Sequence, residues 1–471
     1  MRLAALRNSP IFRKKPVEEL LRSVSHEGGL SKVLGPLDLI LLGIGAIVGT
    51  GIFVITGVAA AYYSGPALLM SFVIAGAVCT VAALCYAEFA AMVPVAGSAY
   101  TYGYAALGEI WAWIIGWDLI LEYSVAIAAV AIGWSGYVVD IIHEAGILLP
   151  AAFIHPPGVP GGMINLPAVL IIAVITALLI RGVKESVRVN TVIVTIKLTV
   201  IALFLILGIT HINPGNWHPF MPYGWHGVLT GAAIVFFAYI GFDAVSTAAE
   251  EVRRPQSDLP IGIVGSLAVS TVLYIAVSAV LTGVVSYLAF KNTDAPVAFA
   301  LESIGYTWGS AVVAAGAICG ITSVLLVLLF GQTRIFFAMA RDGLLPGFFS
   351  SLHPVFRTPS KATLLVGSVT AIIAGLLPLE AVAELVNIGT LAAFIIVSAG
   401  IIVLRRTQPG ITRPFRVPFV PFLPVLCILS CAYLISALPT ITHLRFVVWL
   451  VLGLLIYTGY GRAHSTLQRM F

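Results

Sequence analysis

The sequence is divided into apolar blocks of about 20 residues, and no other feature restricts its fold as strongly. A helix of about 20 apolar residues crosses the roughly 30 Å hydrocarbon core of a bilayer. Hydrophobic residues make up 60% of the 471 residues and charged residues only 10%, whereas about 25% of the residues in a soluble domain are charged. The alternating segments of about ten residues typical of transmembrane β-barrels are absent. We therefore predict an all-α integral membrane protein.

Turn signals between the apolar blocks predict twelve transmembrane helices. Their approximate ranges are 37–62, 66–93, 108–140, 165–181, 185–211, 226–250, 260–288, 309–340, 361–378, 380–404, 418–438 and 442–461. The charged residues 1–36 are predicted to be a cytoplasmic segment in which residues 13–22 form an amphipathic helix on the membrane surface. Residues 462–471 are predicted to be a cytoplasmic tail.

The positive charges are distributed unevenly between the two sides of these spans. Of the 25 Lys and Arg residues, Lys197 falls inside a span, Lys291 and Arg445 fall on one side, and the other 22 fall on the side of the two termini. Cytoplasmic loops carry an excess of Lys and Arg. We therefore expect a multi-pass protein of the cell (plasma) membrane with both termini in the cytoplasm.

The cysteines and histidines do not form a pattern typical of a catalytic or metal site. All five cysteines fall inside apolar blocks without nearby His or acidic ligands, so neither a disulfide framework nor a metal site is predicted. The nine histidines lie mostly in loops and show no H-E-x-x-H spacing. We expect no enzyme activity and no cofactor.

The first predicted span contains four glycines within nine residues, at Gly43, Gly45, Gly49 and Gly51. Each glycine costs a helix about 1 kcal/mol relative to alanine. Close packing against a neighbouring helix is one explanation, because small residues let membrane helices approach each other. The run Gly49-Thr50-Gly51 is denser than packing requires and favours a break in the helix.

The sixth predicted span also contains a candidate helix break. Gly241 follows several aromatic residues there, and Asp243 lies at mid-membrane depth. Five spans separate the two interruptions, and an odd number inverts the topology of the second copy. Paired interruptions in corresponding spans indicate an inverted-repeat transporter with a binding site near the membrane midplane.

A helix that is broken inside a membrane exposes backbone groups that must face protein or a water-filled cavity. Free N–H groups at the start of a half-helix suit a carboxylate, and free carbonyls suit an ammonium group. An α-amino acid carries both charges on one carbon. We therefore expect Gly49, Thr50 and Gly51 to hold the carboxylate, and the carbonyls of the following residues to accept from the amine: Ile47, Phe237, Ala238 and Ile240.

Several motifs resemble those of the amino acid–polyamine–organocation superfamily. They are Gly49-Thr50-Gly51-Ile52-Phe53, the stretch 94–102 (PVAGSAYTY), Gly241-Phe242-Asp243 followed by residues 250–263, and residues 334–346 (RIFFAMARDGLLP). The stretch 241–263 is similar to the cationic amino acid transporter branch, and the twelve predicted spans resemble its bacterial relatives. The resemblance implies a LeuT-like fold, with inverted repeats at 37–211 and 226–404 and two peripheral helices at 418–461.

Lys197 lies in an apolar span that is otherwise free of charge. An ionisable residue at this depth is a functional hypothesis by default, although a lysine near an interface can instead extend its amine to water. In some proton-coupled relatives a lysine of the fifth helix replaces the cation that lies between the first and eighth helices. The resemblance thus implies a proton-coupling role for Lys197, in contact with Gly45, Ala46 and either Thr322 or Ser323.

Three further residues have two interpretations each. Asp243 is a candidate for proton sensing or substrate pairing, or it caps the second half-helix. Glu122 lies in the middle of the third span, where it either faces a substrate side chain or makes a structural hydrogen bond. Phe237 lies beside the second break and either closes over the substrate or packs in the core.

Three classes of function come into question for this protein. The first is a proton-coupled, sodium-independent symporter of L-amino acids, energised by the proton gradient and working by alternating access. The second is an exchanger or facilitator of amino acids or polyamines on the same fold. The third, a membrane enzyme or channel, lacks a nucleophile–base pair, a metal cluster or a pore-lining ring. The expected partners are an L-amino acid, protons and membrane lipids, without nucleic acid; no small membrane subunit or lipid ligand can be identified.

Overall fold

The computed structural model describes residues 13–15, 34–95, 98–181, 186–249, 252–293, 295–354 and 358–469. Within these ranges all regular structure is helical, apart from one isolated β-bridge between Leu34 and Val252. Residues 13–15 are not helical, and the rest of the predicted amphipathic helix lies outside the described residues. The predicted all-α fold class is confirmed.

Among the described residues, eight helical segments are long and apolar enough to cross a membrane. They are Gly51–Met92, Glu109–His143, Asn190–Ile209, Gly224–Thr247, Pro255–Val284, Thr307–Arg341, Ala381–Thr407 and Thr440–His464. Shorter apolar helices cover Pro36–Ile47, Leu166–Arg181, Ser360–Leu376 and Phe422–Ser436. Each of the twelve ranges predicted from the sequence overlaps one or more of these segments.

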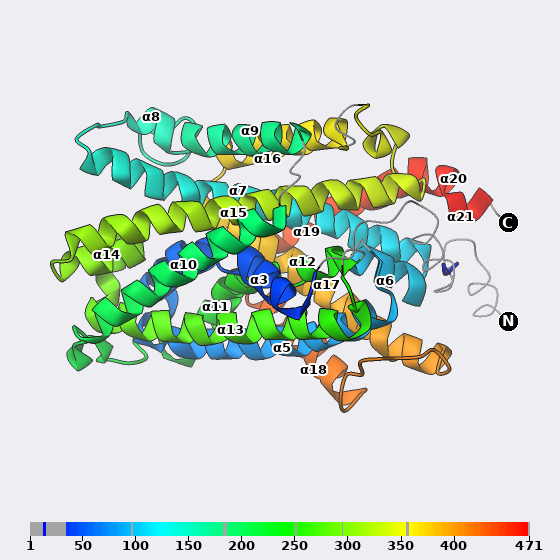
Figure 1. Cartoon of the computed structure of the whole chain (residues 1–471), viewed down its shortest axis with the longest axis horizontal. Coiled ribbons are helices and arrows are strands. Elements are labelled where there is room, and N and C mark those ends of the chain that lie inside the picture. The colour runs from blue at the N-terminus through cyan, green and yellow to red at the C-terminus, as the bar shows by residue number, and fades with distance from the viewer. Residues whose placement is uncertain are drawn as a thin grey trace.

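The principal helices have these bounds: α3 (Pro36–Ile47), α5 (Leu68–Met92), α7 (Glu109–Glu144), α9 (Leu166–Arg181), α10 (Ser186–Ile209), α11 (Gly224–Val235), α13 (Pro255–Val284), α15 (Thr307–Arg341), α16 (Ser360–Leu376), α17 (Leu379–Thr407), α18 (Phe422–Ser436) and α19 (Thr440–Ile456). The short helices are α4 (Thr56–Ala59), α6 (Ser98–Ala106), α8 (Ala151–Ile154), α12 (Ala244–Thr247), α14 (Pro296–Ser303), α20 (Arg462–His464) and α21 (Thr466–Arg469). Figure 1 shows the long helices running lengthwise, with α20 and α21 at one end and α8 and α14 towards the other.

Helix α3 lies inside the bundle, where it packs against α10, α12, α13 and α15. Two of the glycines noted in the first span permit this packing. A Cβ atom at Gly43 would meet Ser266 of α13, and one at Gly45 would meet Asn190 of α10. Both glycines belong to the uninterrupted part of α3, so close packing explains them and only the two later glycines are associated with a break.

The peripheral helix α19 is held against α7 by a stack of indole rings. The rings of Trp117 and Trp449 are stacked with centroids 4.5 Å apart, and Trp113 stacks on Trp117. Each of the paired indoles donates to the other residue's carbonyl, at 2.8 Å from Trp117 and 3.0 Å from Trp449. These bonds satisfy N–H groups that would otherwise be costly in an apolar environment.

Candidate functional site

The first broken helix changes direction at Val48. Helix α3 ends at Ile47, and Val48 adopts an extended conformation with φ −82° and ψ 99°. Helical bonding resumes when the N–H groups of Ile52 and Phe53 donate to the Gly49 carbonyl, at 3.1 and 3.2 Å. Gly49, Thr50 and Gly51 therefore stand at the start of a new helical segment, where N–H groups have no acceptor inside the helix.

The second broken helix is interrupted between α11 and α12. A 3₁₀ turn, η6 (Phe236–Tyr239), follows α11, and Ile240 is extended with φ −63° and ψ 138°. Gly241 has a φ of +110°, a conformation that favours glycine. A Cβ atom there would also lie 3.0 Å from the Ala46 carbonyl oxygen. Gly241 thus lets the second break approach the backbone of the first.

The two breaks face each other across a small cavity. A Cβ atom at Gly51 would overlap Cα and Cβ of Ala238, so the two backbones touch at this point. The cavity beside this contact has a volume of about 20 Å³, which is room for about one water molecule. The structure is therefore closed around the candidate site.

Six of the seven residues predicted to bind the substrate through the breaks line this cavity: Ile47, Gly49, Thr50, Gly51, Phe237 and Ile240. The seventh, Ala238, is packed against Gly51 instead. The remaining lining residues are Ala46, Ala126, Val130, Val324 and Leu328. Thr50 Oγ1 is buried without a hydrogen-bond partner in the described part of the chain, so it is available to a polar ligand.

A tyrosine that the sequence analysis did not single out connects the two breaks. The hydroxyl of Tyr274, on α13, lies 2.9 Å from the Ile47 carbonyl oxygen and 2.6 Å from that of Ala238. These are two of the four carbonyls predicted to accept from the substrate amine. Because one hydroxyl proton can serve only one of them at a time, Tyr274 competes with a ligand for these acceptors.

Lys197 is completely buried on α10, and its Nζ binds the end of α3. It donates to the carbonyls of Gly45 and Val48, at 2.9 and 2.8 Å, and to Ser323 Oγ of α15 at 3.3 Å. The Ser323 hydroxyl itself donates to the Gly320 carbonyl at 2.7 Å. Three acceptors around one nitrogen match the three protons of an ammonium group, and the carbonyl end of a helix favours a positive charge.

Two of the predicted neighbours of Lys197 have other partners. Ala46 lies beside Gly241, and the carbonyl of Val48 binds the lysine in its place. Thr322 donates to the Ile318 carbonyl and accepts from Trp134 Nε1 at 3.0 Å, so it points away from the lysine. The predicted contact with Ala46 is therefore absent, whereas Ser323 makes the contact that was predicted for either Thr322 or Ser323. The reason is local, because the break at Val48 turns the Val48 carbonyl towards α10.

Asp243 is buried and binds residues outside its own helix. Its Oδ2 accepts from Tyr123 at 3.1 Å and from Ser98 at 3.4 Å. The carboxylate makes no capping bond to α12. Asp243 occupies the N-cap position of α12, and its side chain connects the second broken helix to α7 and α6.

Glu122 is buried on α7 but does not line the cavity. Together with Asp118 it lies against Gly389 of α17. The cavity is instead bordered on the α7 side by Ala126 and Val130. The expectation that Glu122 faces a substrate side chain is not met in this closed structure, because the rotation of α7 turns it towards α17.

The amino acid permease family matches residues 34–459. The chain belongs to this family. It is therefore a multi-span membrane permease and not an enzyme, as the sequence predicted.

Several relatives align with almost the whole chain. The branched-chain amino acid permease BcaP of Bacillus subtilis is 51% identical over 462 residues, which is 98% of this chain and 99% of the relative. The methylthioribose transporter of the same organism is 52% identical over 98% of this chain and 100% of its own. The vacuolar cationic amino acid transporter 4 of Arabidopsis thaliana is 31% identical over 97% of this chain and 96% of its own.

Proposed function

We propose that this permease is a secondary active transporter of L-amino acids that is driven by protons, independent of sodium and works by alternating access. The observation that carries the proposal is the pair of facing helix breaks. They present free N–H groups at Gly49, Thr50 and Gly51 beside backbone carbonyls of the second break. This arrangement of donors and acceptors suits the two opposite charges of an α-amino acid.

We propose that the permease lies in the cell membrane and crosses it twelve times. Both of its termini are then in the cytoplasm. Residues 37–211 and 226–404 form the two inverted repeats, and residues 418–461 form the peripheral helices. Support comes from the corresponding positions of the breaks, in the first span of each repeat. The distribution of Lys and Arg supports the orientation.

Lys197 is the proposed coupling residue, and Asp243 is the second candidate. The ammonium group of Lys197 connects α3 to α15 without a carboxylate partner in the described part of the chain. When it loses its proton, two N–H groups remain for three acceptors. The connection between the helices then weakens, and the balance between the conformational states shifts to the extent that they bind the proton differently.

The apolar part of the cavity favours substrates with an aliphatic side chain. Ala126 and Val130 of α7 and Val324 and Leu328 of α15 complete its lining, and no ionisable residue contributes to it among the described residues. Burial of a cationic side chain without a partner is costly. We therefore propose small neutral and branched-chain amino acids as the preferred substrates, in line with the substrate named for one of the bacterial relatives.

A thiosugar is the second candidate substrate, because a relative of equal similarity is a methylthioribose transporter. Methylthioribose has an apolar methylthio group but neither a carboxylate nor an amine. It would therefore leave the N–H groups of the first break without a charged partner. Competition experiments can separate the two candidates.

Leucine, isoleucine and valine are expected to inhibit uptake of radiolabelled leucine into proteoliposomes, whereas the amines formed by their decarboxylation are expected to inhibit weakly. The loss of the carboxylate removes charge-assisted hydrogen bonds worth about 1.5–3 kcal/mol each, which corresponds to at least about a tenfold loss of affinity. Equal inhibition by the amines would show that the N–H groups do not bind a carboxylate. Absence of leucine uptake together with uptake of radiolabelled methylthioribose would favour the thiosugar.

A further inference from the structure

Two cavities of unequal volume lie on the two sides of one contact made by α7. Gly133 of α7 is packed against Thr50, whose methyl group a Cβ atom at residue 133 would overlap. The cavity of about 20 Å³ lies on the Val130 side of this contact. A second cavity of about 160 Å³ lies on the other side, lined by Gly133, Ser135, Gly136 and Val139. The second cavity has about eight times the volume of the first.

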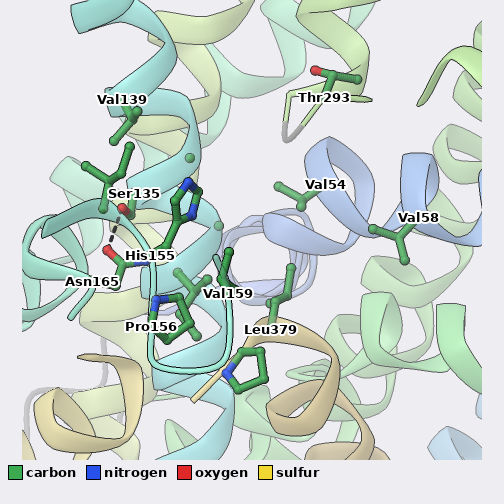
Figure 2. Close-up of a pocket in the computed structure, with 15 residues that line it drawn as sticks. Val54, Val58, Ser135, Val139, His155, Pro156, Val159, Asn165, Thr293 and Leu379 are labelled. Carbon is green, nitrogen blue, oxygen red and sulfur yellow. Dashed lines mark hydrogen bonds between the residues drawn. The ribbon is translucent and has the colours of Figure 1, made fainter. Parts of the chain in front are cut away.

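The second cavity is lined by segments from five parts of the chain, including Thr293 before α14 (Figure 2). Val54 and Val58 belong to the helical segment that follows the first break, and Leu379 begins α17. His155 and Asn165 come from the connection between α7 and α9, and Figure 2 shows them on the side opposite Val54 and Val58. Because α8 precedes His155 and lies towards the end opposite α20 and α21 (Figure 1), the cavity belongs to the proposed outer half.

The walls of the second cavity are mostly apolar, but the side-chain amide of Asn165 supplies one hydrogen-bond donor. Asn165 is 3% exposed, and its Oδ1 accepts from Ser135 Oγ at 2.7 Å and from the Ala168 N–H at 3.2 Å. A backbone N–H can only donate, so the oxygen of the amide must be on that side. Asn165 Nδ2 is thereby turned away from these donors, and it has no hydrogen-bond partner in the described part of the chain.

His155 supplies a second polar group to the same cavity. Its side chain is half-buried, lines the cavity and makes no hydrogen bond to any described residue. Imidazole carries at least one N–H donor in every protonation state. The cavity thus offers two donors, from Asn165 and His155, among aliphatic side chains.

We propose that this cavity is an outer holding site, in which an aliphatic amino acid binds before it passes the Thr50–Gly133 contact. The inference rests on the proposed transport of amino acids. Asn165 Nδ2 and His155 bind the carboxylate, and the substrate side chain packs against Val54, Val58 and Leu379. Pockets for small ligands are typically apolar with a few placed polar groups, and this cavity has that composition.

The holding site predicts an effect confined to one face of the membrane. Asn165→Asp retains an oxygen for Ser135 and Ala168 but replaces the free donor with a negatively charged oxygen, which repels the carboxylate. We expect KM for leucine uptake from the outer face, measured in whole cells, to rise at least about tenfold. KM measured from the inner face, in inside-out membrane vesicles, should change less than about twofold.

The matched control is Asn213→Asp. Asn213 is exposed in the loop between α10 and α11, where its side chain accepts from the Gly215 N–H, a bond that an aspartate preserves. The Asn213→Asp substitution adds the same negative charge outside the cavity, so both KM values should remain unchanged. If Asn165→Asp does not reach the membrane, His155→Asp provides the same test, because the His155 side chain is half-buried and makes no hydrogen bond to the described residues.

Equal changes on both faces would assign Asn165 a purely structural role and overturn the proposal. Unchanged KM values on both faces would also overturn it. Failure of the wild-type protein to transport any amino acid would instead contradict the proposed function. The two inferences can therefore fail separately.

Discussion

Replacement of Lys197 with alanine is expected to abolish accumulation of amino acids driven by a proton gradient, down to the level of protein-free liposomes. The substitution removes all three hydrogen bonds that connect α10 with the end of α3 and with α15. It also removes the only group in this connection that can release a proton. Because the substrate is proposed to bind backbone groups elsewhere, part of the equilibrium binding of leucine should survive.

Lys197→Arg should fail in the same assay, since a guanidinium group does not release its proton under these conditions. The matched control is Lys291→Ala, because Lys291 is exposed in the turn η8 (Tyr287–Asn292), with its amine 5.4 Å from the ring centroid of Tyr62. It should retain gradient-driven uptake. Undiminished gradient-driven uptake by Lys197→Ala would eliminate this lysine as the coupling residue, and Asp243 would become the candidate.

Gly51→Val is expected to abolish substrate binding itself. A side chain at this position would overlap the backbone of Ala238, which cannot move away as a flexible side chain would. It would also fill the space beside the first break in which a carboxylate is proposed to bind. Overpacking costs about 1–3 kcal/mol, and the loss of the carboxylate site adds to this, so affinity should fall at least about tenfold.

Equilibrium binding of radiolabelled leucine to purified protein measures this effect without transport. Gly347→Val is a suitable control, because a Cβ atom at Gly347 meets no other atom within 4 Å. A Gly51→Val protein that folds and binds leucine with normal affinity would exclude the first break as the substrate site. The thermal midpoint of each variant shows whether it remains folded.

The helical fold and both breaks follow from local sequence patterns. Apolar blocks of membrane-spanning length predict helices regardless of how these pack. Gly241 adopts a positive φ, which glycine can do without the steric cost that a side chain would impose. Lys197 was recognisable because a single charge in an apolar span is costly. These features required no knowledge of the neighbouring helices.

Features that depend on the rotation of one helix against another could not be predicted in this way. Glu122 faces α17 because of the orientation of the 36-residue helix α7. Tyr274 reaches both breaks from α13, although the spacing of Ser270, Tyr274 and Ser278 marks one polar helix face that could have identified it. Asn165 was missed because only tertiary packing brings it beside Ser135.

The most direct test of proton-coupled amino acid transport is uptake of radiolabelled leucine by proteoliposomes that contain only the wild-type protein, in sodium-free buffer. With an inward proton gradient, leucine should accumulate inside above its external concentration. Without the gradient, or after a protonophore has collapsed it, leucine should only equilibrate. Uptake that is the same with and without the gradient, or that requires sodium, would contradict the account.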